Sequence, residues 1–279
     1  MDYKLICIDM DGTLLNDKKT ISERNISERN IKAIRLSNDI GVRIAVCTGR
    51  IFTSAESFSD LLGVKSPVIA ANGAYIREKD RDEVIYKSSI GIQKCNKLLS
   101  VFRQYDIYPH FYTNKIIFTE NIEYSSRFYE KTNKTLPKNK QIKVVLVEDW
   151  DTTFKKYEAE IFKSIGVDSD LEKIRKAKIT IRDMNEFEVV SSHFDNFEVT
   201  DKGVSKGNAV KVLGDYYGID RKQIICIGDS ENDLSMIKYA GLGIAMGNAD
   251  EDVKEAAKYI TDNNNCDGVA KAIEKFVLQ

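Results

Sequence analysis

The segment KLICIDMDGTLL, Lys4–Leu15, joins a short apolar run directly to an acidic turn. The apolar run shows no strict alternation, which is typical of a strand covered on both faces, as in a parallel sheet. The turn DMDGT, Asp9–Thr13, places two carboxylates and a glycine immediately after that run. We therefore predict a buried parallel strand that carries an acidic turn at its carboxyl end.

Other segments repeat the same pattern, and amphipathic stretches separate them. The predicted buried strands are Lys4–Asp9, Val42–Thr48, Pro67–Ala71 and Gln223–Asp229. The predicted helices beside them are Ile26–Asp39, Thr53–Leu62, Lys206–Tyr217 and Asn232–Tyr239. Alternation of buried strands and helices is typical of an α/β fold, so we predict a Rossmann-like, doubly wound parallel sheet.

The middle of the chain has a different character. Helical stretches are expected at Gln93–Gln104 and Thr153–Ile165, and strands at Ile116–Thr119, Ile142–Val147, Lys178–Arg182 and Glu186–Ser191. We predict an inserted α+β domain at residues 84–194, within a core formed by residues 1–83 and 195–279. The polar segments Arg77–Glu83 and His193–Asn196 are expected to connect the two domains.

Composition excludes several classes of protein. The 279-residue chain has a net charge of -1, so no bulk attraction to nucleic acid or to an anionic membrane is expected. Its longest apolar runs, such as Leu242–Met246, are far shorter than the ~20 residues of a membrane span. No signal peptide is recognised, and the five cysteines form no CxxC motif. We expect a cytoplasmic protein whose cysteines are buried free thiols.

A tandem repeat lies before the second predicted strand. Ile21–Asn25 and Ile26–Asn30 both read ISERN, and either serine could begin the following helix. A repeat of five residues does not define a solenoid. We interpret it as a small duplication that lengthens a surface loop or the first helical turn.

Polar motifs follow each predicted core strand. They are Asp9–Thr13, Thr48–Arg50, Asn72–Gly73 and Gly228–Asp233. Each motif alone also fits a surface turn or a helix N-terminus. Because parallel strands bring their carboxyl ends to one edge of the sheet, the motifs are expected to converge there. Carboxylates are hard oxygen ligands for Mg²⁺, and glycines allow backbone N–H groups to approach a phosphate, so together they indicate phosphate chemistry.

The chain resembles a haloacid dehalogenase superfamily phosphatase of the Cof type, which has a large type IIB cap inserted after the second motif. The matching motifs are DMDGTLL (Asp9–Leu15), TGR (Thr48–Arg50), KGVSKG (Lys202–Gly207) and GDSENDLSM (Gly228–Met236). They extend along the whole chain in the expected order. The inserted domain resembles the family's cap only in size and style, and the ISERN repeat is a departure from the family.

The resemblance implies roles for four acids. Asp9 would be the nucleophile that forms an aspartyl phosphate, and Asp11 the general acid and then the general base. Asp9, the backbone carbonyl of Asp11, and Asp229 would hold Mg²⁺. Asp233 would orient the metal or its waters.

The resemblance also implies a set of phosphate-binding residues. Thr48 and Gly49 would bind a phosphate oxygen, with Asn232 beside them. Lys206 would place a fixed positive charge near Asp9 and the phosphoryl group. Lys202 is the nearby competitor for that role, and the family motif favours Lys206.

Some residues remain open at this stage. Arg50 either faces the substrate or pairs with an acid of the core. The lysine-rich stretch Lys131–Lys143 forms either a solvated loop or a rim that attracts anionic substrates. His110 and His193 have no partner at metal-ligand spacing, so we interpret them as ordinary residues.

The predicted function is Mg²⁺-dependent hydrolysis of a small phosphate monoester through an aspartyl-phosphate intermediate. A sugar phosphate or related metabolite is the first expectation, ahead of nucleotides and flavin mononucleotide. The alternatives are a phosphomutase of the same superfamily, a phospho-accepting receiver module, and a non-catalytic phosphate binder. We expect the cap to close over the site about hinges near residues 80–86 and 192–200. The oligomeric state is not readable from the sequence.

Overall fold

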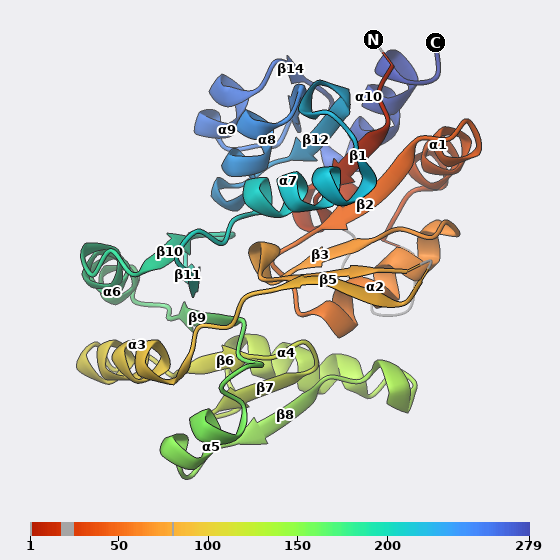
Figure 1. Ribbon diagram of the computed structural model, residues 1–279. Helices are drawn as coiled ribbons and strands as arrows, with labels where there is room; N and C mark the ends of the chain where they lie inside the picture. The colour runs from red at the N-terminus through yellow and green to blue at the C-terminus, as the bar shows by residue number, and fades with distance from the viewer. Residues whose placement is uncertain (1, 18–24, 80) are drawn as a thin grey trace.

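The chain forms two domains, each built on its own β-sheet (Figure 1). The computed structural model describes residues 2–17, 25–79 and 81–279, so most of the first ISERN copy, residues 21–24, lies outside the described residues. Both ends of the chain belong to the larger domain and lie near each other, on the side away from the smaller domain (Figure 1). The inserted arrangement predicted from the sequence is confirmed.

The larger domain, the core, contains an eight-stranded sheet in the order β14-β13-β12-β1-β2-β3-β4-β5. Its strands are β1 (Leu5–Ile8), β2 (Arg43–Cys47), β3 (Val68–Ala70), β4 (Tyr75–Glu78), β5 (Glu83–Lys87), β12 (Ile224–Gly228), β13 (Leu242–Ala245) and β14 (Tyr259–Ile260). Its helices are α1 (Glu28–Asp39), α2 (Phe52–Ser59), α7 (Lys206–Tyr217), α8 (Leu234–Tyr239), α9 (Glu251–Ala256) and α10 (Gly268–Phe276). All neighbouring strands from β14 to β3 are parallel, and the β4–β5 hairpin extends the sheet in antiparallel fashion.

Local sequence explains the central elements of the core. Every residue of β1 and β12 is buried, as their apolar runs predict for strands covered on both faces. Helix α1 packs against α10, and α7 against α8. The side chain of Ser27, in the second ISERN copy, accepts a hydrogen bond from the backbone N–H of Asn30 and begins α1. Ser205 begins α7 in the same way, and Gly218 ends that helix in the left-handed conformation.

The smaller domain, the cap, contains a six-stranded mixed sheet in the order β10-β11-β9-β6-β7-β8. Its strands are β6 (His110–Tyr112), β7 (Ile116–Thr119), β8 (Lys143–Leu146), β9 (Lys163–Val167), β10 (Phe187–Val190) and β11 (Asn196–Asp201). Its helices are α3 (Ile92–Gln104), α4 (Tyr124–Asn133), α5 (Trp150–Lys156) and α6 (Leu171–Asp183). A separate apolar cluster, with Phe102, Phe111, Phe154 and Phe197 wholly buried, stabilises this sheet against its helices.

Two secondary-structure predictions in the cap are wrong. The helix expected at Thr153–Ile165 ends at Lys156. The last residues of the expected range, 163–165, belong to β9, which is buried throughout and pairs with β6 and β11. The strand expected at Lys178–Arg182 is the second half of α6. Asp170 caps α6, and buried residues recur along it at the spacing of one helical face. These two features favour a helix more strongly than the β-branched residues near its end favour a strand.

The strand pairings also differ from the expected domain boundaries. Strand β5 extends to Lys87 and pairs with β4 of the core, whereas the prediction assigned residues 84–87 to the cap. Strand β11 pairs with β9 and β10 of the cap, although the prediction assigned it to the core. The chain therefore crosses between the sheets after Lys87 and after Asp201. We propose domain boundaries at these two crossings.

Further expectations concern cysteines and membranes. Cys7, Cys47, Cys95 and Cys226 are buried free thiols, as predicted, whereas Cys266 is exposed. In the described part of the chain, no helix combines the length and apolarity needed to cross a bilayer.

Candidate active site

A cavity of about 190 Å³ lies where the cap meets the carboxyl ends of the core strands. Core residues that line it include Asp9, Asp11, Thr48, Gly49, Arg50, Ser230 and Asn232. Cap residues that line it include Tyr112, Ser125, Tyr129, Lys163, Ile165, Ser192, Asn196 and Glu198. The predicted motifs therefore converge, and the inserted domain forms the opposite wall.

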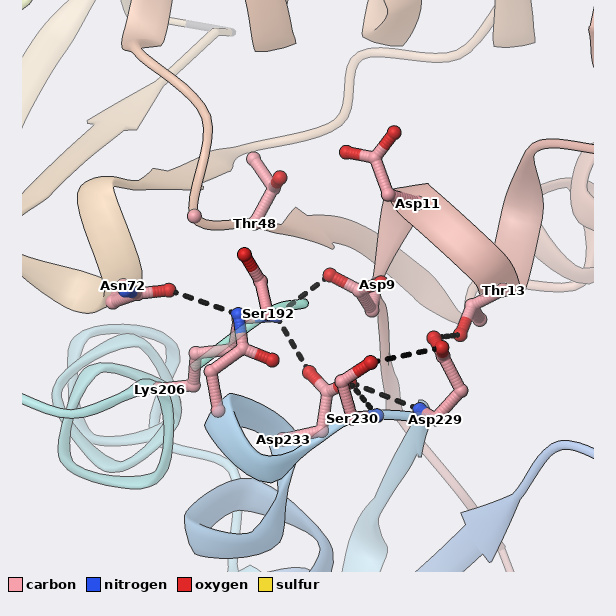
Figure 2. A network of polar contacts seen from close by, with 12 residues as sticks. Asp9, Asp11, Thr13, Thr48, Asn72, Ser192, Lys206, Asp229, Ser230 and Asp233 are labelled. Atoms are coloured by element: carbon pink, nitrogen blue, oxygen red, sulfur yellow. Dashed lines mark hydrogen bonds and ion pairs between the residues drawn. The ribbon is translucent and has the colours of Figure 1, made fainter. Parts of the chain in front are cut away.

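Asp9 lies at the end of β1 and is held by a buried lysine. The Nζ atom of Lys206 donates to Asp9 Oδ1 at 2.6 Å and to Asp233 Oδ1 at 2.5 Å. The side chain of Lys206 has no exposed surface, and that of Asp9 is 7% exposed. Figure 2 shows these side chains meeting below the turn that follows β1. The first residue of α7 thus brings a positive charge to the nucleophile predicted from the sequence.

Three buried carboxylates form a cluster suited to a cation. Oxygen atoms of Asp9, Asp229 and Asp233 all lie within 4.8 Å of one another. Burial and the charge of Asp233 raise the pKa of Asp9 well above its usual range. Burial and Asp233 likewise raise the pKa of Asp229 to about 7. One lysine does not balance three carboxylates, so a divalent ion with a preference for oxygen ligands fits this cluster.

Short contacts fix the orientation of Asp229. Thr13 Oγ1 donates to Asp229 Oδ1 at 2.6 Å, and Ser230 Oγ donates to Oδ2 at 3.0 Å. The Asp233 carboxylate accepts the backbone N–H groups of Asp229 and Ser230 (Figure 2). Gly12 has a φ of +74°, and a Cβ atom there would lie 2.3 Å from Asp229 Oδ2. The turn after β1 therefore requires glycine to approach this carboxylate.

Side chains that follow three core strands lie in or next to the core wall of the cavity. Thr48 is buried, and its Oγ1 accepts the backbone N–H of Arg50 at 3.1 Å. Asn232 Nδ2 donates to Asn72 Oδ1 at 3.2 Å. A Cβ atom at Gly49 would lie within 3 Å of both Asn72 Oδ1 and the Glu198 carboxylate of the cap. Glycine at this position therefore lets the core loop and the cap meet closely.

Asp11 stands apart from the acidic cluster and pairs with Arg50. The guanidinium group of Arg50 donates to Asp11 Oδ1 at 2.5 Å and to Oδ2 at 2.7 Å. The surrounding protein raises the pKa of this carboxyl by partial desolvation, but the charge and hydrogen bonds of Arg50 outweigh that effect and lower it. Of the two readings of Arg50, pairing with a core acid is the one that the structure shows.

A second ion pair lies within the cap, between Lys163 of β9 and Glu198 of β11, and its hydrogen bonds reach the core. Lys163 Nζ lies 2.9 Å from Glu198 Oε2 and also donates to the backbone carbonyl of Gly49. Asn72 Nδ2 donates to Glu198 Oε2 at 2.6 Å, and Ser192 Oγ donates to Oε1 at 2.6 Å. Burial raises the pKa of Glu198, but Lys163 and these donors outweigh it, so the pKa is lowered and the carboxyl is ionised.

The cap also contacts the core loop Gly228–Asp233, through ion pairs and a hydrogen bond to Glu231. Lys178 and Arg182 of α6 each lie 2.7 Å from a carboxylate oxygen of Glu231. The backbone N–H of Ser191 donates to the same carboxylate at 3.0 Å. A further contact between the domains, remote from the cavity lining, joins Lys140 to Asp60 at 2.9 Å. Lys140 is the one residue of the lysine-rich stretch for which the structure shows an ion pair to the core, in the part of the chain that it describes.

The sequence-predicted residues divide into three groups. Residues brought together at the carboxyl ends of the core strands are Asp9, Thr48, Gly49, Lys206, Asp229, Asn232 and Asp233. Asp11 lines the same cavity, but its carboxylate faces Arg50. Lys202, the competitor of Lys206, is half-exposed and contacts Asn185 and Glu188 instead. Residues that sequence reasoning left without a role in the site are Thr13, Asn72, Lys163, Ser192 and Glu198.

Comparison with known families decides the identity of this site. A family described as haloacid dehalogenase-like hydrolases matches residues 6–273 of the chain. The chain belongs to this family. Together with the inserted cap, the match makes it a haloacid dehalogenase phosphatase of the Cof type, subclass IIB, which acts on small phosphate monoesters.

Curated relatives and solved structures of haloacid dehalogenase phosphatases cover nearly the whole chain. A 5-amino-6-(5-phospho-D-ribitylamino)uracil phosphatase of Bacillus subtilis is 35% identical, over 100% of this chain and 97% of its own. A phosphoglycolate phosphatase of Methanobrevibacter smithii is 30% identical over 100% of both chains. A haloacid dehalogenase-like hydrolase of B. subtilis has a TM-score of 0.85 at 28% identity, covering 98% and 100%. A subclass IIB sugar phosphatase has a TM-score of 0.76 at 25% identity, covering 99% and 100%.

Proposed function

We propose that this phosphatase hydrolyses a sugar phosphate or related metabolite in a Mg²⁺-dependent reaction through an aspartyl phosphate at Asp9. The observation that carries the proposal is the position of Asp9, a buried carboxylate that opens onto the cavity and is paired with Lys206. The ammonium group of Lys206 lowers the pKa of Asp9 against the larger raising effects of burial and Asp233, and a cation bound in the cluster would lower it further, so that the ionised carboxylate can attack phosphorus.

The two steps assign different tasks to the residues around Asp9. In the first step, a carboxylate oxygen of Asp9 attacks phosphorus and the ester P–O bond breaks. Asp11, protonated once its pair with Arg50 is broken, gives its proton to the departing alkoxide. In the second step, Asp11 takes a proton from water as the water oxygen attacks the aspartyl phosphate, which releases inorganic phosphate and restores Asp9. Thr48, Gly49 and Asn232 bind phosphate oxygens, and Lys206 offsets their charge.

Mg²⁺ is the cation that we propose for the carboxylate cluster. Asp9, Asp229 and the backbone carbonyl of Asp11 would hold it, and Asp233 would orient Asp229 through its contact with the backbone. Bound there, it would reduce the repulsion between the anionic nucleophile and the anionic phosphate. The raised pKa values of Asp9 and Asp229 support this proposal, because burial and the negative charge of Asp233 both disfavour their ionised forms, which a bound cation would stabilise.

The names of the relatives restrict the class of substrate only partly. One is named for a phosphorylated ribitylamino compound, another for phosphoglycolate, and a solved structure is named as a sugar phosphatase. Hydrolysis of phosphoglycolate releases an alcohol that carries a carboxylate, whereas hydrolysis of a sugar phosphate or of the ribitylamino compound releases a neutral alcohol. The polar, uncharged side chains of Tyr112, Ser125, Tyr129, Ser192 and Asn196 in the cap wall support a sugar phosphate.

Movement of the cap accompanies this chemistry in our proposal. The expected hinges at residues 80–86 and 192–200 lie largely within β5 and β11, so they are unsuitable. The crossings between the sheets contain Gly91 and Gly203, which both have positive φ values and open space where a Cβ atom would lie. We propose that the cap opens about these glycines and closes to exclude water.

The test is phosphate release from a panel of sugar phosphates, nucleotides and p-nitrophenyl phosphate. It is run with Mg²⁺ and with EDTA, on the wild type and on Asp9→Asn. Activity that requires both the metal and Asp9 supports the proposal. Isomerised phosphate esters without free phosphate would indicate a phosphomutase, and a long-lived phosphoprotein would indicate a receiver-like module. Binding without turnover would indicate a non-catalytic phosphate binder.

A further inference from the structure

The buried pair of Lys163 and Glu198 lies on the cap side of the cavity, opposite the nucleophile. We propose that this pair selects the leaving group, accepting a neutral alcohol that carries a hydroxyl group and rejecting one that carries a carboxylate. The inference rests on the proposed function, because it concerns the alcohol released when Asp9 takes the phosphoryl group.

The cap sheet brings the two residues to the cavity from separate strands. Lys163 begins β9 and Glu198 lies in β11, and these strands are neighbours in the cap sheet. Each side chain is only 5% exposed, yet both line the cavity that also contains Asp9 and Asp11. Their exposed atoms therefore face the space where a leaving group would lie beyond the phosphate.

Hydrogen-bonding capacity points to a hydroxyl group as the ligand. An ammonium group has three donors, and Lys163 uses two of them, on Gly49 and Glu198. A carboxylate has about four acceptor sites, and Glu198 uses three, for Asn72, Lys163 and Ser192. One donor of Lys163 and one acceptor site of Glu198 therefore remain. A hydroxyl group both accepts and donates, so it can satisfy the two together, whereas an ionised carboxylate only accepts.

The charge balance of the cavity disfavours a second anion. Among the described residues that line it, the two cations are Arg50 and Lys163, and each is already paired with a carboxylate. A leaving group with a carboxylate would lose its water beside the ionised Glu198 and gain no unpaired cation. A neutral polyol avoids that cost.

The test compares two esters that share a carbon skeleton, glycerol 3-phosphate and 3-phosphoglycerate, which differ by an alcohol and a carboxylate at one end. The measured quantity is the ratio of kcat/KM for the first ester to that for the second. We expect the wild type to favour glycerol 3-phosphate by at least about tenfold.

Variants of the two residues should change this ratio in opposite directions. Glu198→Gln leaves a net positive pair and should lower the ratio about tenfold or more, whereas Lys163→Met leaves a net negative pair and should raise it. Lys140→Met is the matched control, because it removes a cap lysine that pairs with the core Asp60 away from the cavity lining. That control should leave the ratio unchanged.

A loss of cap packing alone would affect both esters alike and would leave the ratio where it was. The inference is overturned if the wild type prefers 3-phosphoglycerate, or if both variants shift the ratio in the same direction or not at all. Release of phosphate from p-nitrophenyl phosphate by the wild type distinguishes a failure of this inference from a failure of the proposed function. If the wild type releases phosphate neither from this ester nor from any other member of the panel, the proposed function fails; if it releases phosphate and the ratio is unshifted, only the selection by Lys163 and Glu198 fails.

Discussion

Replacement of Lys206 by methionine tests how strongly the site depends on one buried charge. The substitution keeps most of the apolar stem and removes an ammonium group that lies 2.6 Å from Asp9 and 2.5 Å from Asp233. All three side chains are buried, so Lys206→Met leaves carboxylates without their cation in a site that water barely reaches. Removal of one partner from a buried ion pair typically costs about 3–5 kcal/mol.

The assay is equilibrium unfolding in denaturant with EDTA present. We expect Lys206→Met to lose about 3–5 kcal/mol of unfolding free energy, or roughly 5–9 °C in Tm at about 2.1 cal/mol/K of unfolding entropy per residue. The deficit should shrink as the pH falls toward 5. Without the lysine, the pKa of Asp9, already raised by burial and Asp233, rises further and the carboxyl takes up a proton. Added Mg²⁺ should restore part of the loss.

The same helix provides the control for this experiment. Lys211 of α7 pairs with Asp215 at 2.5 Å, but its side chain is 57% exposed. Lys211→Met should therefore leave the unfolding midpoint unchanged within error. The reasoning is refuted if Lys206→Met costs less than about 1 kcal/mol, the range of an exposed ion pair, or if its cost is independent of pH.

Three further predictions concern the pH profile, the metal and the cap. Arg50→Met should raise the pKa of Asp11, which Arg50 now lowers, so the alkaline limb of kcat/KM should move to higher pH; an unmoved limb contradicts this. The pKa of Asp229 is raised to about 7, so the metal-free protein should lose stability as the pH rises through 7. Protons then compete with Mg²⁺, and thermal stabilisation by Mg²⁺ should be larger at pH 8 than at pH 6; equal stabilisation would count against the metal site. Glu231→Gln should raise KM about threefold to tenfold, since both cations of α6 lose their charged partner; an unchanged KM would exclude a role in closure.

The core was largely predictable because its signals are local. Apolar runs such as Ile224–Gly228 mark strands buried on both faces, and the carboxyl ends of parallel strands necessarily share one edge. That rule alone placed Asp9 and Asp229 together, although 220 residues separate them in the sequence. The cap carries weaker signals. The run Lys178–Arg182 contains β-branched residues typical of a strand, but the cap of α6 at Asp170 and its buried face decide for a helix.

The cap side of the site could not be predicted for a related reason. Lys163 and Glu198 face the cavity because β9 and β11 are neighbours in the cap sheet, and sequence order does not give that pairing. A faint signal was present, since Glu198 lies between Phe197 and Val199, and Lys163 directly follows Ile161 and Phe162. Buried charges are rare unless paired, so two such segments in one domain indicate a buried ion pair. For Arg50, the sequence left open whether it faces the substrate or pairs with an acid of the core, and it did not identify Asp11 as that acid.

The most direct test of the central claim is to trap the phosphate on Asp9. Asp11→Asn removes the proposed base of the second step, while p-nitrophenyl phosphate needs little acid assistance in the first. Rapid quenching of this variant with Mg²⁺ and that substrate, followed by peptide mapping, measures covalent phosphate at each position. We expect stoichiometric phosphate on Asp9 and none in Asp9→Asn. Turnover by the wild type with no phosphate on Asp9 in the trapped variant would contradict the account and would indicate direct attack by water.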